Sequence, residues 1–542
     1  MSELQTEIQK RRTFAIISHP DAGKTTLTEK LLLYGGAIHL AGSIKSRKTQ
    51  RHAVSDWMEI EKQRGISVTS SVLQFDYAGC RINILDTPGH QDFSEDTYRT
   101  LMAVDSAVMI IDVAKGVEAQ TKKLFKVCKQ RHIPIFTFVN KLDRYGKAPL
   151  ELMEEIEEVL GIRSYPMNWP IGTDGHYKGI YHRETGKVEL FSEDITHGQE
   201  ERQSIIYDLN DAQAKEAIGE DIYQALLDDI DLLDVAGEEW SMDKVNKGEL
   251  TPMFFGSAMT NFGVRGFLEE YLRLAPPPQP RMSSDGLISP DDEKFSGFVF
   301  KIQANMNPAH HDRLSFIRIC SGKFERGMSV YHMQGGKSVK LSQPQQFLAQ
   351  DRQIIDTAYP GDIVGLFDPG IFGIGDTLCT PSHKFKFADF PVFPPERFAR
   401  VSAKDTMKRK QFVKGIMQLT QEGAVQLFQQ AGAGMESYIV GTVGQLQFDV
   451  LEYRLKSEYN TQIVMNMQPF EVARWLRFKD GRPVTPEALR GADRGMFVYD
   501  MKDRPVLLVN NEWALGWIQD NNPDLEMFPV PPEKQDAEDD MK

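Results

Sequence analysis

A loop of phosphate-binding character stands near the N-terminus of the chain. Residues 18–25 read SHPDAGKT, between an apolar run and a helix-like segment. Backbone N–H groups at the start of such a helix face an anion. Lys24 can supply positive charge for the β- and γ-phosphates of a nucleotide, and Thr25 can supply a hydroxyl for Mg²⁺. Ser18 replaces the usual first glycine, so an ordinary turn with an exposed lysine remains an alternative for this loop taken alone.

A second candidate loop, DTPGH at residues 86–90, follows the apolar run RINIL. The carboxylate of Asp86 can hold Mg²⁺ through a water molecule. Gly89 can offer its backbone N–H to a γ-phosphate, because no Cβ blocks close approach. The alternative is an ordinary Pro-Gly turn, which is common.

Two further loops have residues that can recognise a base. NKLD at residues 140–143 follows the apolar run PIFTFV, and GSA at residues 256–258 follows MFF. Asp143 can accept hydrogen bonds from both N1–H and the exocyclic amine of guanine, a pair that adenine does not offer. Lys141 can lie across the purine face, and the backbone of GSA can contact the guanine oxygen. Each motif is weak alone.

The prediction of a nucleotide site depends on the order of the four loops. Each loop follows a strand. Along the chain, the first suits phosphate binding, the second suits the metal and the γ-phosphate, and the last two suit the base. Chance rarely produces all four in that order. We therefore predict an enzyme that hydrolyses GTP to GDP with Mg²⁺ as cofactor; an ATPase is the alternative, which competition with ATP would reveal. The predicted nucleotide contacts are Ser18, His19, Pro20, Asp21, Ala22, Gly23, Lys24, Thr25, Thr26, Asp86, Thr87, Pro88, Gly89, His90, Asn140, Lys141, Leu142, Asp143, Ser257 and Ala258.

The elements that must position these loops alternate between buried strands and helices, which predicts a doubly wound, mostly parallel α/β sheet of the P-loop GTPase class. Proline clusters near residues 276–280 and 391–395 mark linkers. Short strands punctuated by glycine and proline between them predict an antiparallel β-barrel, and an α+β domain follows. The predicted divisions are 1–280 for the α/β domain with an acidic insertion at about 161–250, 290–388 for the barrel, 392–532 for the α+β domain with a helical stretch at Gln411–Gln430, and a frayed charged tail at 533–542.

Composition excludes several classes of protein. The net charge of −14 argues against broad, non-specific wrapping of nucleic acid. The four cysteines lie far apart without zinc-ligand or redox spacing, so we expect reduced packing cysteines. The N-terminus is polar and no apolar run is long enough to cross a bilayer, so we expect a cytoplasmic protein with no membrane partner.

Several segments resemble those of translational GTPases. EKQRGISV at residues 61–68 is similar to the first switch of that family, and DTPGH is similar to the second. HPDAGKTT, RGISV, DRLSFIRICSGKFERGMSVY, GTVGQLQFDVLEYRL and the length of three domains resemble the bacterial class II peptide-chain release factors over nearly the whole chain. This resemblance implies a monomeric, ribosome-stimulated GTPase of translation termination that promotes departure of class I release factors. Its partners would be the ribosome and those factors.

The resemblance also implies roles for single residues. His90 would position the attacking water once the ribosome orders it, and Lys24 would offset the developing charge, which makes both catalytic. Ile66 and Pro20 would form an apolar gate beside the water. Ser67 stands where the family has threonine, and its hydroxyl would reach Mg²⁺. Without the neighbouring motifs, His90 would be taken for a surface histidine in a turn.

Three alternatives remain open: a translocation-type elongation factor, a ribosome-protection factor, and a nucleotide-gated ribosome-binding module whose hydrolysis is incidental. Translocation factors add two small domains of about 200 residues together after the third domain, and little of this chain follows its third domain. Faster turnover of release factors on terminated ribosomes would separate a termination factor from the other two.

Overall fold

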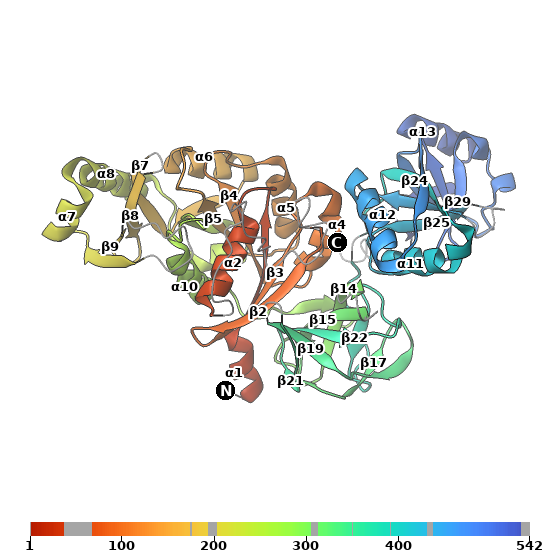
Figure 1. The fold of residues 1–542 in the computed structure, drawn as a ribbon, viewed down its shortest axis with the longest axis horizontal. Helices are drawn as coiled ribbons and strands as arrows, with labels where there is room; N and C mark the ends of the chain where they lie inside the picture. Colours follow the sequence, from red (N-terminus) through yellow and green to blue (C-terminus); the bar gives the residue numbers. More distant parts are fainter. Residues whose placement is uncertain are drawn as a thin grey trace.

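The computed structural model describes residues 2–36, 68–173, 176–192, 203–304, 313–348, 351–390, 392–430 and 437–532. Figure 1 shows three bodies along the chain: an α/β domain, an antiparallel β domain below it, and a C-terminal domain, drawn in blue, to one side. This order confirms the predicted fold class. Within the described residues, no helix combines the length and apolar character that crossing a bilayer requires.

The α/β domain is built on a sheet of seven strands in the order β2-β3-β1-β4-β5-β11-β6. All neighbouring pairs are parallel except β2 with β3. Parallel strands need crossovers, so most of the loops at their carboxyl ends meet at one edge of the sheet. The strands are β1 (Arg11–Ser18), β2 (Ser71–Tyr77), β3 (Cys80–Asp86), β4 (Ser106–Asp112), β5 (Ile135–Asn140), β6 (Arg163–Pro166) and β11 (Leu250–Phe255).

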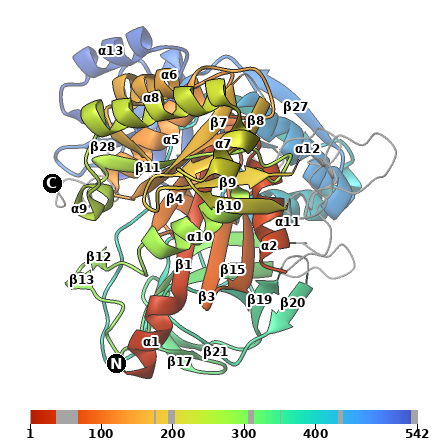
Figure 2. The ribbon, with the colours of Figure 1, turned by 90° about the vertical axis from the view of Figure 1, so that its left-hand side faces the viewer.

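Helices cover both faces of this sheet, which explains why its central strands are buried along their whole length (Figure 2). Alternate residues of β1 belong to different cores: Phe14 and Ile16 pack on the side of α2 and α10, and Ala15 and Ile17 on the side of α5 and α6. The helices are α1 (Glu3–Lys10), α2 (Lys24–Tyr34), α4 (Ser94–Leu101), α5 (Ala119–Gln130), α6 (Pro149–Leu160) and α10 (Val264–Leu274), with the 3₁₀ turn η1 (Gln91–Phe93) before α4.

The acidic insertion forms a separate antiparallel sheet in the order β10-β9-β8-β7, with the long helix α8 and two short helices in the same segment. Trp169 on β7 donates from its indole nitrogen to Asp229 on α8 over 2.9 Å. The expected start at residue 161 is too early, since β6 pairs with β11 in the main sheet. The elements are β7 (Asn168–Thr173), β8 (His176–His182), β9 (Lys187–Phe191), β10 (Ser204–Asp208), α7 (Ala212–Ile218), α8 (Glu220–Ala236) and α9 (Met242–Asn246).

The β domain follows a short ribbon formed by β12 (Arg281–Ser283) and β13 (Gly286–Ile288). Its main sheet has eight strands in the order β18-β17-β23-β14-β15-β22-β19-β20, and every adjacent pair is antiparallel. These strands are β14 (Ser296–Ala304), β15 (Arg313–Ser321), β17 (Ser329–His332), β18 (Lys337–Lys340), β19 (Pro344–Leu348), β20 (Asp351–Ile354), β22 (Ile363–Phe367) and β23 (Thr377–Cys379); β16 (Phe324–Glu325) pairs with β21 (Thr357–Ala358).

The C-terminal domain is an antiparallel sheet in the order β27-β24-β26-β25-β29-β30-β28-β31. The expected helix at Gln411–Gln430 is wrong in its second half, because the helix ends at Gln421 and a strand begins at Gln426. Gly423, with φ of 73°, turns the chain between them. The elements are β24 (Arg397–Ala403), η2 (Thr406–Lys408), α11 (Arg409–Gln421), β25 (Gln426–Gln430), β26 (Ser437–Thr442), α12 (Gln445–Tyr459), β27 (Ile463–Gln468), β28 (Val472–Phe478), η3 (Pro486–Ala488), η4 (Ala492–Arg494), β29 (Met496–Asp500), β30 (Pro505–Val509), α13 (Glu512–Asn521) and β31 (Leu525–Phe528).

Candidate nucleotide-binding site

The phosphate loop connects the end of β1 to the start of α2, as its sequence predicts. Two of its residues adopt left-handed backbone, Asp21 with φ of 65° and Gly23 with φ of 99°. A side chain at Gly23 would be excluded, since an added Cβ would lie 2.3 Å from Nδ2 of Asn140. The glycine therefore lets the phosphate loop and the base loop approach each other, with the first N–H groups of α2 opening toward the strand ends.

Lys24 and the DTPGH loop meet beside the phosphate loop. Lys24 is 7% exposed and Asp86 is 2% exposed, and Nζ of the lysine lies 3.8 Å from Oδ1 of the carboxylate. Thr87 anchors its loop by donating to the carbonyl oxygen of Ile16 on β1, over 2.7 Å. An added Cβ on Gly89 would lie 3.4 Å from Cα of Pro20 and 3.8 Å from Nζ of Lys24. A charged lysine, a carboxylate and an unhindered backbone amide thus share one small volume.

His90 caps the 3₁₀ turn that follows this loop. Its Nδ1 accepts from the backbone N–H of Asp92 over 3.2 Å, and its ring lies edge-on to Phe93 with 6.3 Å between ring centroids. The side chain is 33% exposed. His90 is thus half-buried and held by its own turn, next in sequence to the glycine that faces Lys24.

Asn140, at the end of β5, is buried and joins the loops. Its Nδ2 donates to the carbonyl oxygen of Ala22 over 2.9 Å, and its Oδ1 accepts from the N–H of Ala258 over 2.9 Å. The sequence predicts a nucleotide contact at Asn140. The structure adds that this amide connects the phosphate loop to the GSA segment. Ala22 lies 118 residues before Asn140 in the chain, and Ala258 lies 118 residues after it.

Asp143 and Ser257 lie together at the base end of the site. The hydroxyl of Ser257 donates to Oδ1 of Asp143 over 2.5 Å, and Nε of Arg144 lies 3.8 Å from Oδ2. The N–H of Leu142 donates to the carbonyl oxygen of Gly256, so the two base loops are also joined through their backbones. The carboxylate of Asp143 is therefore oriented by the hydroxyl of Ser257 in the neighbouring loop.

Asp112, at the end of β4, contacts a predicted base-loop residue although no motif pointed to it. Its Oδ2 accepts from Nζ of Lys141 over 2.6 Å, while Lys141 also donates to the carbonyl oxygen of Asp21. Burial alone would raise the pKa of Asp112, but the hydrogen bonds from Lys141 and the N–H of Ala114 hold that pKa below its ordinary value. A carboxylate at the end of the buried run AVMII was the signal for it in the sequence.

The residues present fit a magnesium-bound guanine nucleotide. Thr25 opens α2 beside the loop, and Asp86 supplies one carboxylate at the neighbouring strand end. Among the described residues, no group of three acidic, histidine or cysteine side chains stands ready to hold a metal alone. That suits Mg²⁺, which takes one or two protein oxygens and fills its shell with water and phosphate oxygens.

The strand ends bring together the predicted phosphate, metal and base residues, which sequence places in four separate loops. Two of the predicted site residues lie outside the described residues: Ser67, expected at the metal, and Ile66, expected in the gate with Pro20. Val68, the first described residue after these two, is buried against Phe93.

Three family models match the chain in succession. The Elongation factor Tu GTP binding domain matches residues 9–277, Elongation factor G domain 2 matches residues 294–381, and the C-terminal domain of Class II release factor RF3 matches residues 387–519. The three matches follow the α/β, β and C-terminal domains.

Curated relatives match along almost the whole chain. Peptide chain release factor 3 of Symbiobacterium thermophilum is 58% identical over 525 residues, covering 97% of this chain and 98% of that protein. The protein of the same name from Listeria innocua is 56% identical and covers 97% of this chain and 99% of its own length. The one from Cyanothece sp. is 51% identical, with 98% and 97% covered.

A solved crystal structure of a protein from Thermus thermophilus has the same fold, with a TM-score of 0.68, over 87% of this chain and 69% of that one. At 22% identity it supports the fold alone. The matched domains and the identity of the relatives decide the family: the chain belongs to the class II peptide-chain release factors, translational GTPases that act in termination.

Proposed function

We propose that this chain binds Mg·GTP across the carboxyl ends of β1, β3, β5 and β11 and hydrolyses it on the terminated ribosome. The hydrolysis cycle promotes dissociation of class I release factors, and the protein works as a monomer in the cytoplasm. The observation that carries the proposal is the meeting of Lys24, Asp86 and Gly89 at one end of the site with Asp143 and Ser257 at the other. One end suits a triphosphate and the other suits guanine.

The phosphates lie on the N–H groups of the loop and of the first turn of α2, with Lys24 against the β- and γ-phosphates. Bound Mg²⁺ neutralises phosphate charge, and Thr25, Ser67 and Asp86 are the residues that would hold it, the last through water. Gly89 donates its backbone N–H to the γ-phosphate. The site therefore distinguishes GTP from GDP by a contact that only the third phosphate can make.

His90 orients the attacking water, while Lys24 offsets charge that develops on the transferred phosphoryl group. Pro20 and Ile66 form the apolar gate through which His90 reaches the water. Positioning supplies most of the rate enhancement in this chemistry, so hydrolysis is slow until the ribosome orients His90 toward the water. Loss of the γ-phosphate contact releases the loops, and the other domains shift against the α/β domain.

The direct test is multiple-turnover peptide release with limiting class I release factor, with and without the protein and GTP. We expect release to accelerate only when both are present, because each class I factor must leave before it acts again. Absence of any acceleration, with GTP hydrolysis intact, would leave the ribosome-protection and binding-module alternatives instead.

Two variants divide binding from chemistry. Lys24→Ala should weaken GTP binding, since a buried cation facing the phosphates is lost; affinity equal to the parent's would remove the phosphate-loop assignment.

His90→Ala should retain GTP affinity and lose ribosome-stimulated turnover. Stimulated turnover that survives this change would rule out the water-positioning role of His90.

A further inference from the structure

Helix α12 begins without a side-chain cap of its own. Its N-cap residue is Gly444, which has no side chain to accept from the first N–H groups of the helix. Oε1 of Gln447 turns back to accept from the N–H groups of Val443 and Gly444, over 2.8 and 3.1 Å. The N–H of Leu446, in the first turn, must therefore find its acceptor elsewhere.

Asp92 of the α/β domain provides that acceptor. Its Oδ2 accepts from the N–H of Leu446 over 2.8 Å, across 354 residues of sequence. An added Cβ on Gly444 would lie 2.0 Å from Cγ of Asp92 and 2.3 Å from both carboxylate oxygens. The carboxylate thus occupies the position of a missing N-cap side chain, at the end of the helix dipole that favours negative charge. Asp92 is buried in this arrangement.

The same residue holds His90. The backbone N–H of Asp92 donates to Nδ1 of His90 over 3.2 Å, and Oδ1 of Asp92 lies 3.4 Å from that nitrogen. The N–H of Phe93 donates to the carbonyl oxygen of His90 over 3.1 Å, which closes the 3₁₀ turn. The backbone N–H of Asp92 therefore holds the ring of His90, and its carboxylate binds the N-terminus of α12 in the C-terminal domain.

Apolar packing joins the same two places. Phe93, directly after Asp92, lies in a buried cluster with Val68 and with Val450 of α12. Leu446 and Tyr453 of α12 pack against this cluster. Because Phe93 also lies edge-on to His90, a movement of α12 changes the support on both sides of the 3₁₀ turn.

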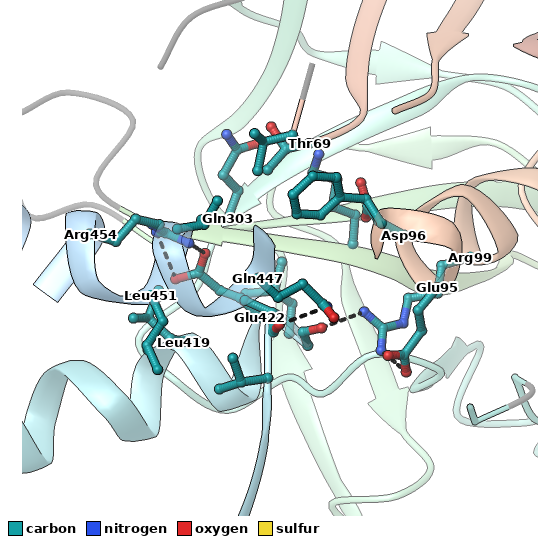
Figure 3. Close-up of a pocket in the computed structure, with 18 residues that line it drawn as sticks. Thr69, Glu95, Asp96, Arg99, Gln303, Leu419, Glu422, Gln447, Leu451 and Arg454 are labelled. Atoms are coloured by element: carbon teal, nitrogen blue, oxygen red, sulfur yellow. Dashed lines mark hydrogen bonds and ion pairs between the residues drawn. The ribbon is translucent and has the colours of Figure 1, made fainter. Parts of the chain in front are cut away.

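Open space lies beside this contact. A pocket occurs where α4, β14, α11 and α12 meet, lined among others by Phe93, Arg99, Gln303, Leu419 and Val450 (Figure 3). Arg99 crosses its edge by donating to the carbonyl oxygen of Gly423 over 3.2 Å. The contact of η1 with α12 therefore borders open space on this side, and the apolar packing across it is the small cluster around Phe93 and Val450.

We propose that Asp92 is a positioning residue that restrains His90 while α12 is docked, so that undocking of the C-terminal domain frees His90 for catalysis. The inference rests on the proposed role of His90. In the docked state, the lone pair of Nδ1 is occupied and the turn is held at both ends. Movement of α12 separates the carboxylate of Asp92 from the helix N-terminus and loosens the turn. The position of the C-terminal domain is thereby transmitted to the water-positioning histidine.

The test uses one variant on each side of the contact in the full-length protein. Asp92→Ala removes the acceptor, and Gly444→Ala displaces the carboxylate without a substitution in the α/β domain; the backbone at Gly444, with φ of −139°, accepts alanine. Both should raise ribosome-independent, single-turnover GTP hydrolysis by about fivefold, at the lower end of allosteric coupling between sites. Affinity for GDP should stay within about twofold of the parent value, because neither residue belongs to the nucleotide loops. Asp92→Asn, which retains an acceptor oxygen for Leu446, should restore most of the restraint.

Matched controls are Gln91→Ala and Gln445→Ala, which change exposed neighbours at the two ends of the contact. Both should hydrolyse GTP at the parent rate. The combined variant Asp92→Ala/Gly444→Ala should be no faster than either single variant, since both remove one interaction. Adding His90→Ala to Asp92→Ala should abolish the gain, which a general loosening of the domain would not require.

Docking is measured separately by energy transfer between two fluorescent labels. The labels are attached to cysteines introduced at Lys126 on α5 and Lys414 on α11, which are both exposed. Cys80 is replaced first, because it alone of the four cysteines is not buried. Asp92→Ala should alter the label distance whether or not His90 is catalytic. If His90→Ala alone retains stimulated turnover, the proposed function of His90 fails while the docking result stands. An unchanged or lower ribosome-independent rate in Asp92→Ala and Gly444→Ala overturns the restraint.

Discussion

At the scale of single residues, the site consists of side chains whose orientation is fixed by a neighbouring loop. The carboxylate of Asp143 is held by Ser257, and the ammonium group of Lys141 by Asp112. Such preorganisation matters because a group already in place loses little conformational freedom when the ligand binds. Substitutions at these positions should therefore change affinity or selectivity more than they change stability.

Asp143→Asn should move base preference from guanine toward xanthine. An amide offers one acceptor and one donor, so it mismatches the two donors of guanine and suits the carbonyl of xanthine. Each hydrogen bond to a charged group contributes about 1.5–3 kcal/mol, so we expect selectivity to change on the order of a hundredfold or more. Competition between GDP and XDP would measure it, with Tyr145→Ala, an exposed neighbour, as control. Unaltered selectivity for GDP would remove Asp143 from the base site.

Asp112→Asn should lower GDP affinity about tenfold, since loss of one charge-assisted hydrogen bond of about 1.5 kcal/mol leaves Lys141 less fixed. The folded-state pKa of Asp112 lies below its ordinary value of 3.8. The ionised carboxylate therefore adds to the free energy of unfolding at pH values above 3.8. The contribution is lost as pH falls through the folded-state pKa. The parent's advantage in free energy of unfolding over Asp112→Asn should thus be constant from about pH 6 to 8 and vanish in stronger acid. Lys122→Ala, exposed on α5, should show neither effect.

At the scale of elements, close helix packing in the C-terminal domain depends on one glycine. The two helices that flank the contact with the α/β domain, α11 and α12, share a buried apolar cluster that includes Phe412, Leu419 and Leu455. Gly415 lies where they come nearest, because an added Cβ would lie 2.7 Å from Cδ2 of Leu455 and 2.8 Å from Cγ of Tyr459. Glycine, a poor helix former, is therefore required at this position because the packing of α11 against α12 leaves no room for a side chain.

Gly415→Ala should lower the free energy of unfolding by about 1–3 kcal/mol, as overpacking of a core does. The matched control is Gly516→Ala on α13, where an added Cβ meets nothing within 4 Å. That control should raise stability by about 0.5–1 kcal/mol, because alanine favours the helix. Urea unfolding followed by tryptophan fluorescence measures both. A stabilised Gly415→Ala would contradict the assigned packing.

At the scale of the whole molecule, the α/β and β domains meet through buried charge. Asp105, just before β4, accepts from Arg318 on β15 over 2.5 Å and from Arg281 on β12 over 3.2 Å. Arg318 is 1% exposed, and it also donates to the carbonyl oxygen of Gly361 over 2.8 Å. Burial lowers the pKa of Arg281, and Asp105 counteracts that effect. One carboxylate thus pairs with two guanidinium groups at the domain boundary, that of buried Arg318 and that of half-buried Arg281.

Asp105→Asn should destabilise the folded chain by about 3–5 kcal/mol, because both guanidinium groups would lose their charged partner. Asp243→Asn is the control, since it breaks an exposed ion pair with Lys247 and should change stability by less than about 1 kcal/mol. Differential scanning calorimetry would also reveal whether the two domains then unfold separately. A parent-like unfolding profile for Asp105→Asn would show that the buried charges contribute little.

Short motifs were enough to predict the family, the fold class and the position of the four candidate loops at strand ends, because each motif consists of a few consecutive residues after a strand. The turn that ends α11 at Gly423 was also visible among the residues, although periodicity alone overlooked it. Contacts between distant residues emerged only once the domains were folded together: Asn140 with Ala22 and Ala258, Asp105 with Arg318, and Asp92 with Leu446. The physical reason is that a carboxylate or an amide has no sequence period or spacing that names its partner. Its partner is the group that folding of the domains places within hydrogen-bond distance.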